Sequence, residues 1–161
     1  MWYDISMNEL TFSPEALMAM QEAGWKYNPS RQWFECEYYQ SYNRAHVAYD
    51  LSDYTGYDVS LHDTSIDKGY WYVSLNTDDQ CFDFAKKYDE WHEARQRISH
   101  AFFVNKASFN RTLVLTQEQY NKVAKMVDRY DKKIVGDHYL IAIPQNETTK
   151  RIIAILDALG M

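Results

Sequence analysis

The residue pair best suited to covalent catalysis is Cys81 with His46. Cys81 follows a predicted strand at the start of a predicted helix, where the helix dipole can lower the pKa of a thiol. His46 lies in the stretch Ala-His-Val-Ala, which we predict to be a strand, and an imidazole beside a thiol can act as its general base. Cys81 also lies on the apolar face of its helix, where a buried structural thiol is expected. We therefore favour the structural role and keep a cysteine hydrolase as an alternative.

The order of these two residues, histidine first and cysteine 35 residues later, resembles that of permuted papain-like hydrolases. The resemblance implies hydrolysis by a thiolate, with Cys81 as the nucleophile and His46 as its base. The sequence departs from that pattern because neither glycine nor asparagine stands beside Cys81.

Other histidines and carboxylates give weaker chemical patterns. His62-Asp-Thr64 matches one of the two His-x-Thr/Ser motifs that a 2H-type phosphoesterase needs, and the sequence has no second one. Asp89 and His92 lie three residues apart on one predicted helix face, without a second pair at the spacing of a metal site. The five glycines are scattered singly, so no phosphate-binding loop is predicted. We expect no metal, no cofactor and no enzymatic activity.

Four helices follow from capping signals and apolar periodicity. The first three begin with a hydroxyl residue whose side chain can accept from the first backbone N–H groups of the helix. The longest is predicted over about 77–98 and the last over 148–159, and Gly24 and Gly160 are expected to end the first and last helices. The predicted N-caps are Ser13 (followed by Pro14), Thr77 and Thr116, whereas the last helix is predicted from its apolar residues and Gly160.

Alternating apolar and polar residues predict the strands. This pattern covers 34–38, 47–51 and 71–75 in the first half of the chain, and 111–115 and 138–143 in the second. The predicted fold is therefore α+β, a single domain over residues 1–161 with a mainly antiparallel sheet and three to four helices.

Two stretches echo each other, Leu10-Thr-Phe-Ser-Pro-Glu and Leu113-Val-Leu-Thr-Gln-Glu. Both lead from strand-like residues through a cap into a helix. Because this is the commonest local pattern in proteins, we predict no internal repeat from it.

The net charge of −6 comes from the first half of the chain. Residues 1–75 hold four Lys and Arg against eleven Asp and Glu, whereas the remaining residues hold thirteen against twelve. The same 75 residues hold ten of the fourteen Tyr and four of the five Trp. An acidic surface disfavours nonspecific binding to nucleic-acid phosphates and favours basic partners.

The acidic, aromatic first half is a candidate protein-binding surface. Rings can anchor an interface while carboxylates steer the approach of a basic partner. The alternative is that the tyrosines face the core and the aspartates only solvate loops. The candidate partner-binding residues are Trp33, Tyr38, Tyr39, Asp50, Asp53, Tyr54, Tyr57 and Asp58.

The segment 23–34 resembles a short helix-to-hairpin module of phage and plasmid proteins. The resemblance is carried by Gly24, Trp25, Asn28, Pro29, Arg31 and Trp33. Gly24 is expected to reverse the chain, Asn28-Pro29 to begin a turn, and Trp25 to stack with Trp33 across the hairpin. Relatives of this module accompany nucleic-acid-processing domains, so a second alternative is single-stranded nucleic-acid binding through Trp25, Arg31 and Trp33. The following Glu35 and Glu37 make direct nucleic-acid binding the less expected reading.

In kind, the chain is similar to small phage or mobile-element proteins that inhibit host-defence complexes, anti-CRISPR proteins among them. The resemblance implies a non-enzymatic module that docks onto the basic, nucleic-acid-binding surface of a protein partner.

Residues 1–10 carry Asp4 and Glu9 and no run reaches the length of a membrane span, so we predict neither a signal peptide nor a membrane segment. We expect a cytoplasmic location, in the host if the protein is phage-encoded, with Cys36 and Cys81 as free thiols. Self-association to a homodimer is an open alternative for the aromatic surface.

Overall fold

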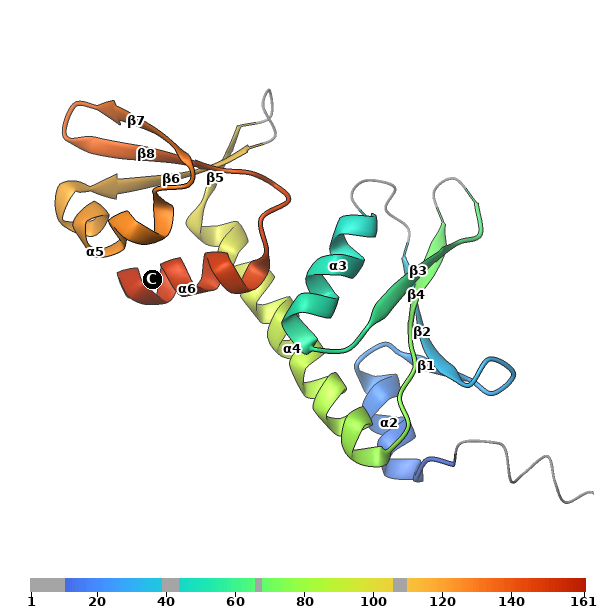
Figure 1. The fold of residues 1–161 in the computed structure, drawn as a ribbon. Helices are drawn as coiled ribbons and strands as arrows, with labels where there is room; N and C mark the ends of the chain where they lie inside the picture. The colour runs from blue at the N-terminus through green and yellow to red at the C-terminus, as the bar shows by residue number, and fades with distance from the viewer. Residues whose placement is uncertain (1–10, 39–43, 66–67, 106–109) are drawn as a thin grey trace, which may run out of the picture. The chain divides into compact units, whose positions relative to one another are not determined.

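In this computed structural model the chain folds into two compact units, unit 1 (Met1–Trp91) and unit 2 (His92–Met161). The structure describes residues 11–38, 44–65, 68–105 and 110–161. Each unit is built on its own four-stranded antiparallel sheet (Figure 1). The predicted α+β fold is confirmed.

In the described part of unit 1, two helices and four strands precede the long helix that ends it. The sheet has the strand order β1-β2-β4-β3, so β2 and β4 are central and β1 and β3 are edges. The elements are α2 (Pro14–Glu22), β1 (Lys26–Asn28), β2 (Trp33–Tyr38), α3 (Arg44–Thr55), β3 (Val59–Asp63), β4 (Gly69–Val73) and α4 (Asp78–Ala101), whose second half enters unit 2.

Unit 2 continues from α4 with a second sheet in the order β5-β6-β8-β7. Its last helix ends at Gly160, which adopts a left-handed conformation with φ 71° and allows the N–H groups of Gly160 and Met161 to cap the helix. The elements are β5 (Phe103–Asn105), β6 (Asn110–Thr116), α5 (Gln117–Val127), β7 (Asp131–Val135), β8 (His138–Ile143) and α6 (Thr149–Leu159).

The two units repeat one topology. Both run helix, two strands, helix, two strands, helix, with α4 ending the first copy and beginning the second, and both sheets have the same strand order. The register also agrees, because the central strand pair β2·β4 matches β6·β8 residue by residue. Equivalent cross-strand pairs are Phe34–Val73 with Leu113–Ile141, and Cys36–Trp71 with Leu115–Tyr139, all packed in or against the core of their unit.

The final helices of the two copies also correspond. The Thr77 hydroxyl accepts from the N–H of Gln80 at 3.2 Å, and the Thr148 hydroxyl accepts from the N–H of Arg151 at 3.4 Å. Each threonine is followed by core residues at the same four offsets. These are Cys81, Phe84, Ala85 and Tyr88 in unit 1, and Ile152, Ile155, Leu156 and Leu159 in unit 2.

The prediction that the echo in the sequence marks no repeat holds, but the repeat of topology in the structure was not predicted. The echo in the sequence was a poor guide because it aligns the helix after Ser13 with the helix after Thr116. The shared topology instead pairs α3 with α5. The positions of core residues and the strand register are common to the two copies, whereas residue identities are few.

The capping predictions are confirmed. Ser13 accepts from the N–H of Ala16, Thr77 and Gln80 form a reciprocal capping box, and so do Thr116 and Gln119. The predicted strands around 34–38, 71–75, 111–115 and 138–143 correspond to β2, β4, β6 and β8.

The strand predicted over 47–51 is wrong, because these residues belong to α3. Alternation in the sequence suggested a strand, yet the buried positions Ala48, Leu51 and Thr55 are spaced by three and four residues, as on a helix. The hydroxyls of Ser52 and Thr55 donate to carbonyls one turn earlier, at 2.8 Å each. With α3, the described residues hold five helices rather than three to four. The single domain stays a prediction, since two compact units can unfold together or separately.

Candidate protein-binding face

Strand alternation gives the sheet of unit 1 two different faces. On one face Phe34, Val59 and Val73 are buried against the helices, where they join Leu51 of α3 and Phe84 of α4. The opposite face, which we call the open face, carries side chains that remain partly or fully exposed. They are Trp33, Glu35 and Glu37 of β2, Tyr70 and Tyr72 of β4, and Ser60 and His62 of β3.

Four rings cross the open face in a continuous line, which we call the aromatic ribbon. Trp33 stacks on Tyr72 with ring centroids 3.9 Å apart and an interplanar angle of 26°. Tyr72 lies 6.1 Å from Tyr70, and Tyr70 stacks with His62 at 4.9 Å. The ribbon therefore runs from β2 across β4 to the edge strand β3.

Polar contacts hold the Trp33 end of the ribbon in place. The indole Nε1 of Trp33 and the side-chain amide of Asn28 both donate to Oε1 of Glu35, each at 2.8 Å. The guanidinium carbon of Arg31 lies 5.5 Å from the centroid of the Trp33 ring, within the range of a cation–π contact. Because its neighbours orient the indole, this end of the face is organised before any partner arrives.

The turn between β1 and β2 is also well defined. Asn28 accepts from the backbone N–H groups of Ser30 and Arg31 at 3.1 and 3.3 Å, as predicted for an Asn-Pro turn. Gln32 has φ 58°, a left-handed conformation that is uncommon outside glycine. This conformation lies between Arg31 and Trp33 at the entry to the strand that carries the indole.

Unit 2 shows that the fold does not require these rings. By strand register, the positions equivalent to Trp33, Tyr72 and Tyr70 are Thr112, Leu140 and His138. The same topology and core are thus built with a hydroxyl, an aliphatic and an imidazole side chain there. The aromatic ribbon is a property of the surface of unit 1, not a need of the scaffold.

The predicted partner-binding residues do not form one surface. Trp33 belongs to the open face, and Asp53 and Asp58 are exposed near α3. Asp50 is buried, and its carboxylate accepts from Trp91 Nε1 at 3.1 Å, so it supports the core. Tyr39 and the side chain of Tyr38 lie outside the described part of the chain.

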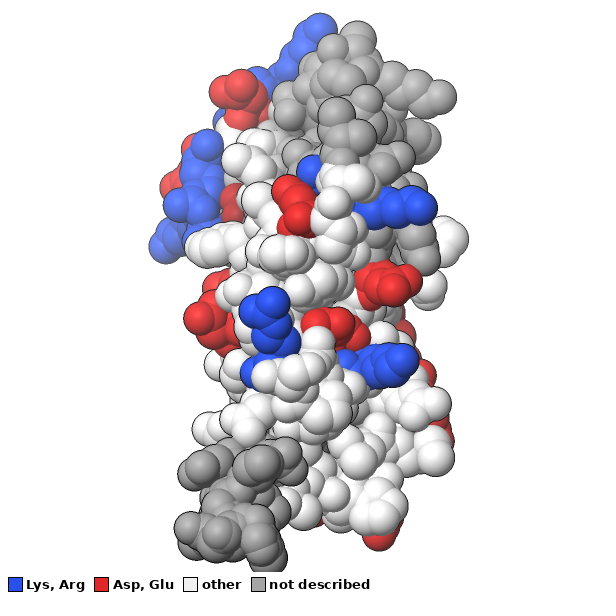
Figure 2. All heavy atoms as spheres, turned by 90° about the vertical axis from the view of Figure 1, so that its right-hand side faces the viewer, with Lys and Arg blue, Asp and Glu red and all other residues white. Residues whose placement is uncertain are grey.

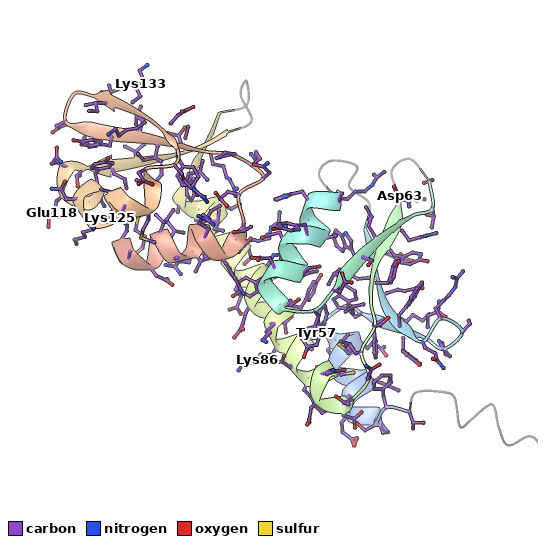
Figure 3. The ribbon with its side chains drawn as sticks, in the orientation of Figure 1. Tyr57, Asp63, Lys86, Glu118, Lys125 and Lys133 are labelled. Carbon is purple, nitrogen blue, oxygen red and sulfur yellow. The ribbon has the colours of Figure 1, made fainter. Side chains whose placement is uncertain are left out.

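The two remaining tyrosines of the prediction are partly buried. Tyr54 packs against the core of unit 1. Tyr57, at the end of α3 beside α4 (Figure 3), donates to Asp83 at 2.8 Å and packs edge-on against Phe84. Burial and then the hydrogen bond to Asp83 raise the pKa of Tyr57 to about 12. Both rings belong to the packing between the helices of unit 1 more than to the open face.

Sequence reasoning missed Tyr70, Tyr72 and His62 as members of a site. The signal was present, because the predicted inward alternation of Trp71 and Val73 places Tyr70 and Tyr72 on the outward face. The sequence did not reveal that β2 pairs with β4, because a helix and a strand separate the two along the chain.

Trp25 does not stack on Trp33 as predicted. It is fully buried and packs edge-on against Phe84 and Tyr88, with centroid distances of 5.0 and 5.4 Å. The reason is that Trp25 precedes β1 and continues the buried face of α2, behind Ala16 and Met20. Only one tryptophan of the hairpin is therefore available to a ligand.

The proposed nucleophile is buried. Cys81 has no exposed surface, and burial raises the pKa of its thiol to about 11, opposite to the shift that a catalytic thiolate needs. His46 lies on α3 rather than on a strand, with its ring 6.3 Å from that of Tyr49. The geometry favours the structural role of Cys81.

The other chemical patterns find no site in the described parts of the chain. No group of three or more His, Cys, Asp or Glu there could hold a metal ion. His62 is stacked on Tyr70 within the aromatic ribbon. Within the described ranges no helix has both the length and the apolarity to cross a bilayer.

The two units differ more in net charge than residues 1–75 and the remaining residues do. Unit 1 holds six Lys and Arg against sixteen Asp and Glu, a net charge of −10, and unit 2 holds eleven against seven, a net charge of +4. In unit 2, Lys125 projects from α5 and Lys133 from β7 (Figure 3). On the side where Figure 1 places the strands of unit 1, acidic and basic groups are scattered over a mostly uncharged surface (Figure 2). On this side the charged groups are therefore not gathered into one patch of a single sign (Figure 2).

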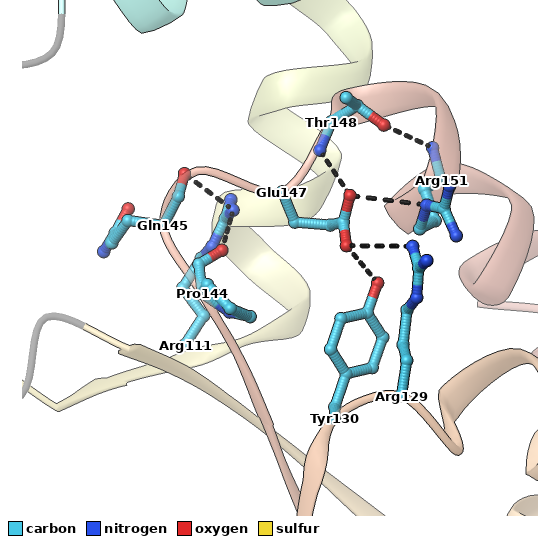
Figure 4. A network of polar contacts seen from close by, with 8 residues as sticks. All are labelled: Arg111, Arg129, Tyr130, Pro144, Gln145, Glu147, Thr148 and Arg151. Carbon is cyan, nitrogen blue, oxygen red and sulfur yellow. Dashed lines mark hydrogen bonds and ion pairs between the residues drawn. The ribbon is translucent and has the colours of Figure 1, made fainter.

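A polar network in unit 2 surrounds Glu147 and ties the start of α6 to the residues around it. Glu147, just before α6, accepts from the Tyr130 hydroxyl at 2.5 Å and the Thr148 N–H at 2.9 Å, and pairs with Arg151 at 3.4 Å and Arg129 at 3.8 Å (Figure 4). Burial, and then the bond to Glu147, raise the pKa of Tyr130. The carboxylate supplies the negative charge that a helix N-terminus favours.

Comparison with protein-family models, with curated proteins and with solved structures finds no match for this chain. The site itself therefore carries the functional argument.

Proposed function

We propose that this chain is a non-enzymatic protein-binding module that docks the open face of unit 1 onto a protein partner with a basic surface. The observation that carries the proposal is the aromatic ribbon, a line of four partly or fully exposed rings, of which the equivalent positions of unit 2 keep only the imidazole of His138. Trp and Tyr are the residues most enriched at energetically important interface positions. Such a module fits the phage or mobile-element inhibitors of host-defence complexes, acting in the cytoplasm of the host.

Electrostatics supports a basic partner. The net charge of −10 on unit 1 raises the rate at which a positive surface approaches, while the rings supply the short-range contacts. The same charge opposes a nucleic-acid ligand, because phosphates are repelled by it. The burial of Trp25 removes one of the three residues on which nucleic-acid binding would depend.

Site-specific photo-crosslinking tests the proposal. A photoreactive phenylalanine analogue replaces Tyr72 in one variant and Leu140, its equivalent in unit 2, in the matched control. We expect the Tyr72 variant to crosslink one stoichiometric protein in lysate of the source cell, identified by mass spectrometry and then rebound as a purified protein in a salt-dependent manner. Equal background from both variants contradicts the proposal, and crosslinking only to a second copy of this chain replaces it with self-association.

A further inference from the structure

The open face already accommodates one guanidinium group. Arg31 is exposed, yet its guanidinium carbon lies 5.5 Å from the centroid of the Trp33 ring. A planar guanidinium stacks on aromatic faces and also forms paired hydrogen bonds with carboxylates, which an ammonium group cannot match in geometry. The contact shows which chemistry suits this face.

Rings and carboxylates are paired on the open face. Glu35 lies directly across from Tyr72 in the register of β2 and β4, and Glu37 lies directly across from Tyr70. All four side chains point to the open face, since they alternate with the buried Phe34 and Val73. Each pair places a tyrosine and a carboxylate at neighbouring positions of the open face, and aromatic rings and carboxylates are the two kinds of group that together recognise arginine.

The two pairs are separated by two residues along each strand. At roughly 3.4 Å per residue, their separation is about 7 Å. Alternate side chains of an extended peptide are spaced by the same distance, because they also lie two residues apart on one face. The pairs therefore match arginines at positions i and i+2 of an extended segment.

Glu35 retains capacity for a ligand. In the described structure, Asn28 and Trp33 both donate to its Oε1 atom, and a carboxylate has a second oxygen with its own lone pairs. The positions equivalent to Glu35 and Glu37 in unit 2 are Val114 and Thr116, so the ring–carboxylate pairs exist in one copy of the repeat.

We propose that the open face of unit 1 binds an extended Arg-x-Arg segment, with one guanidinium at the Glu35–Tyr72 pair and the other at the Glu37–Tyr70 pair. This inference rests on the proposed function and names the chemistry of the partner. The arginine at the Glu35–Tyr72 pair would lie next to Trp33, the ring over which the guanidinium of Arg31 already lies.

Labelled peptides of one composition and different spacing provide the test. The full chain is titrated by fluorescence anisotropy with a Gly-Ser peptide carrying Arg-Ser-Arg, with its isomers Arg-Arg-Ser and Arg-Ser-Ser-Arg, and with the Lys-Ser-Lys and citrulline analogues. A cation–π contact at an exposed site is worth roughly a two- to fivefold change in affinity, so two of them predict that Arg-Ser-Arg binds about tenfold more tightly than Lys-Ser-Lys. The Arg-Arg-Ser and Arg-Ser-Ser-Arg isomers are expected to lose about half of the binding free energy that distinguishes Arg-Ser-Arg from Lys-Ser-Lys. The reason is that each isomer can place an arginine at only one of the two ring–carboxylate pairs.

Variants borrowed from unit 2 keep the scaffold intact. Tyr72→Leu and Glu37→Thr place residues that the equivalent positions already hold, and because each removes one of the two pairs, each is expected to lose about half of the advantage of Arg-Ser-Arg over Lys-Ser-Lys. Leu140→Ala in unit 2 is the matched control and is expected to leave binding unchanged. Circular dichroism verifies that each variant is folded.

Equal binding of the arginine and lysine peptides, equal binding of the isomers, or no peptide binding overturns the Arg-x-Arg inference. Tighter binding of a single-stranded oligonucleotide than of Arg-Ser-Arg overturns it as well. These outcomes are separate from the proposed function, because a partner crosslinked at Tyr72 but indifferent to these peptides leaves a protein-binding face of another specificity.

Discussion

The indole Nε1 of Trp91 donates a hydrogen bond to the carboxylate of Asp50 at 3.1 Å, and both side chains are buried in unit 1. The carboxylate thus joins α3 to the long helix α4. An aspartate that the sequence placed among partner-binding residues is a member of the core.

We predict opposite outcomes for two neighbouring aspartates of α3. Asp50→Lys places an unmatched cation in the core and should reduce the free energy of unfolding by about 3 kcal/mol or more. Asp53→Lys changes the same charge at an exposed position and should alter it by no more than about 0.5 kcal/mol. Urea denaturation followed by tryptophan fluorescence measures both. Similar losses in the two variants would contradict the burial of Asp50.

The thiols should react slowly in the folded protein. Burial raises the pKa of Cys81 to about 11 from an ordinary value of 9.0 and also raises the pKa of Cys36, so little thiolate exists at neutral pH. In a Cys36→Ser variant, a chromogenic disulfide reagent should label Cys81 many times more slowly than it labels the same variant in denaturant. Rapid labelling at pH 7 would restore the cysteine-hydrolase alternative.

Alkaline conditions should destabilise unit 1. The raised pKa values of Cys81, about 11, and of Tyr57, about 12, mean that the folded state favours their neutral forms. Their contribution to stability is complete below the ordinary pKa values of 9.0 and 10.0 and is lost as the pH rises through 11 and 12. Urea midpoints should fall between pH 8 and pH 11, and less steeply in Cys81→Ala. Equal slopes in the two proteins would show that Cys81 does not titrate with folding.

Helix capping in unit 2 provides a test of the single domain. Thr148→Ala removes the acceptor for the Arg151 N–H and should cost about 1 kcal/mol. All five tryptophans belong to unit 1, so their fluorescence reports on that unit alone, whereas circular dichroism reports on both. Because α4 contributes to both cores, we expect the two signals to shift together. A shift in circular dichroism without one in fluorescence would indicate two domains that unfold independently.

Local signals predicted local structure well. Ser13, Thr77 and Thr116 cap helices as expected, because a capping interaction depends on residues within one turn, and Thr148 caps the last helix in the same way. The strand predicted at 47–51 was wrong because a short amphipathic segment can fit both the two-residue period of a strand and the 3.6-residue period of a helix. The residues form a helix, on which Ala48 and Leu51 are both buried.

The candidate site was predicted less well, for a physical reason. Trp33 was identified, but its neighbour Tyr72 lies on a strand 30 or more residues away, and only the pairing of β2 with β4 brings the rings together. Asp50 was misjudged because charge and position along the chain do not reveal that Trp91 offers it a buried donor. Contacts across a sheet or between helices depend on the topology, which composition does not contain.

The shared register of the two units makes this chain a ready template for engineering avidity. Transplanting Trp33, Glu35, Tyr72 and Tyr70 onto Thr112, Val114, Leu140 and His138 would give unit 2 a ring–carboxylate pair equivalent to Glu35–Tyr72 and make the molecule bivalent. Against a ligand long enough to reach both faces, the second contact becomes intramolecular, and the apparent affinity rises without any improvement in either face alone.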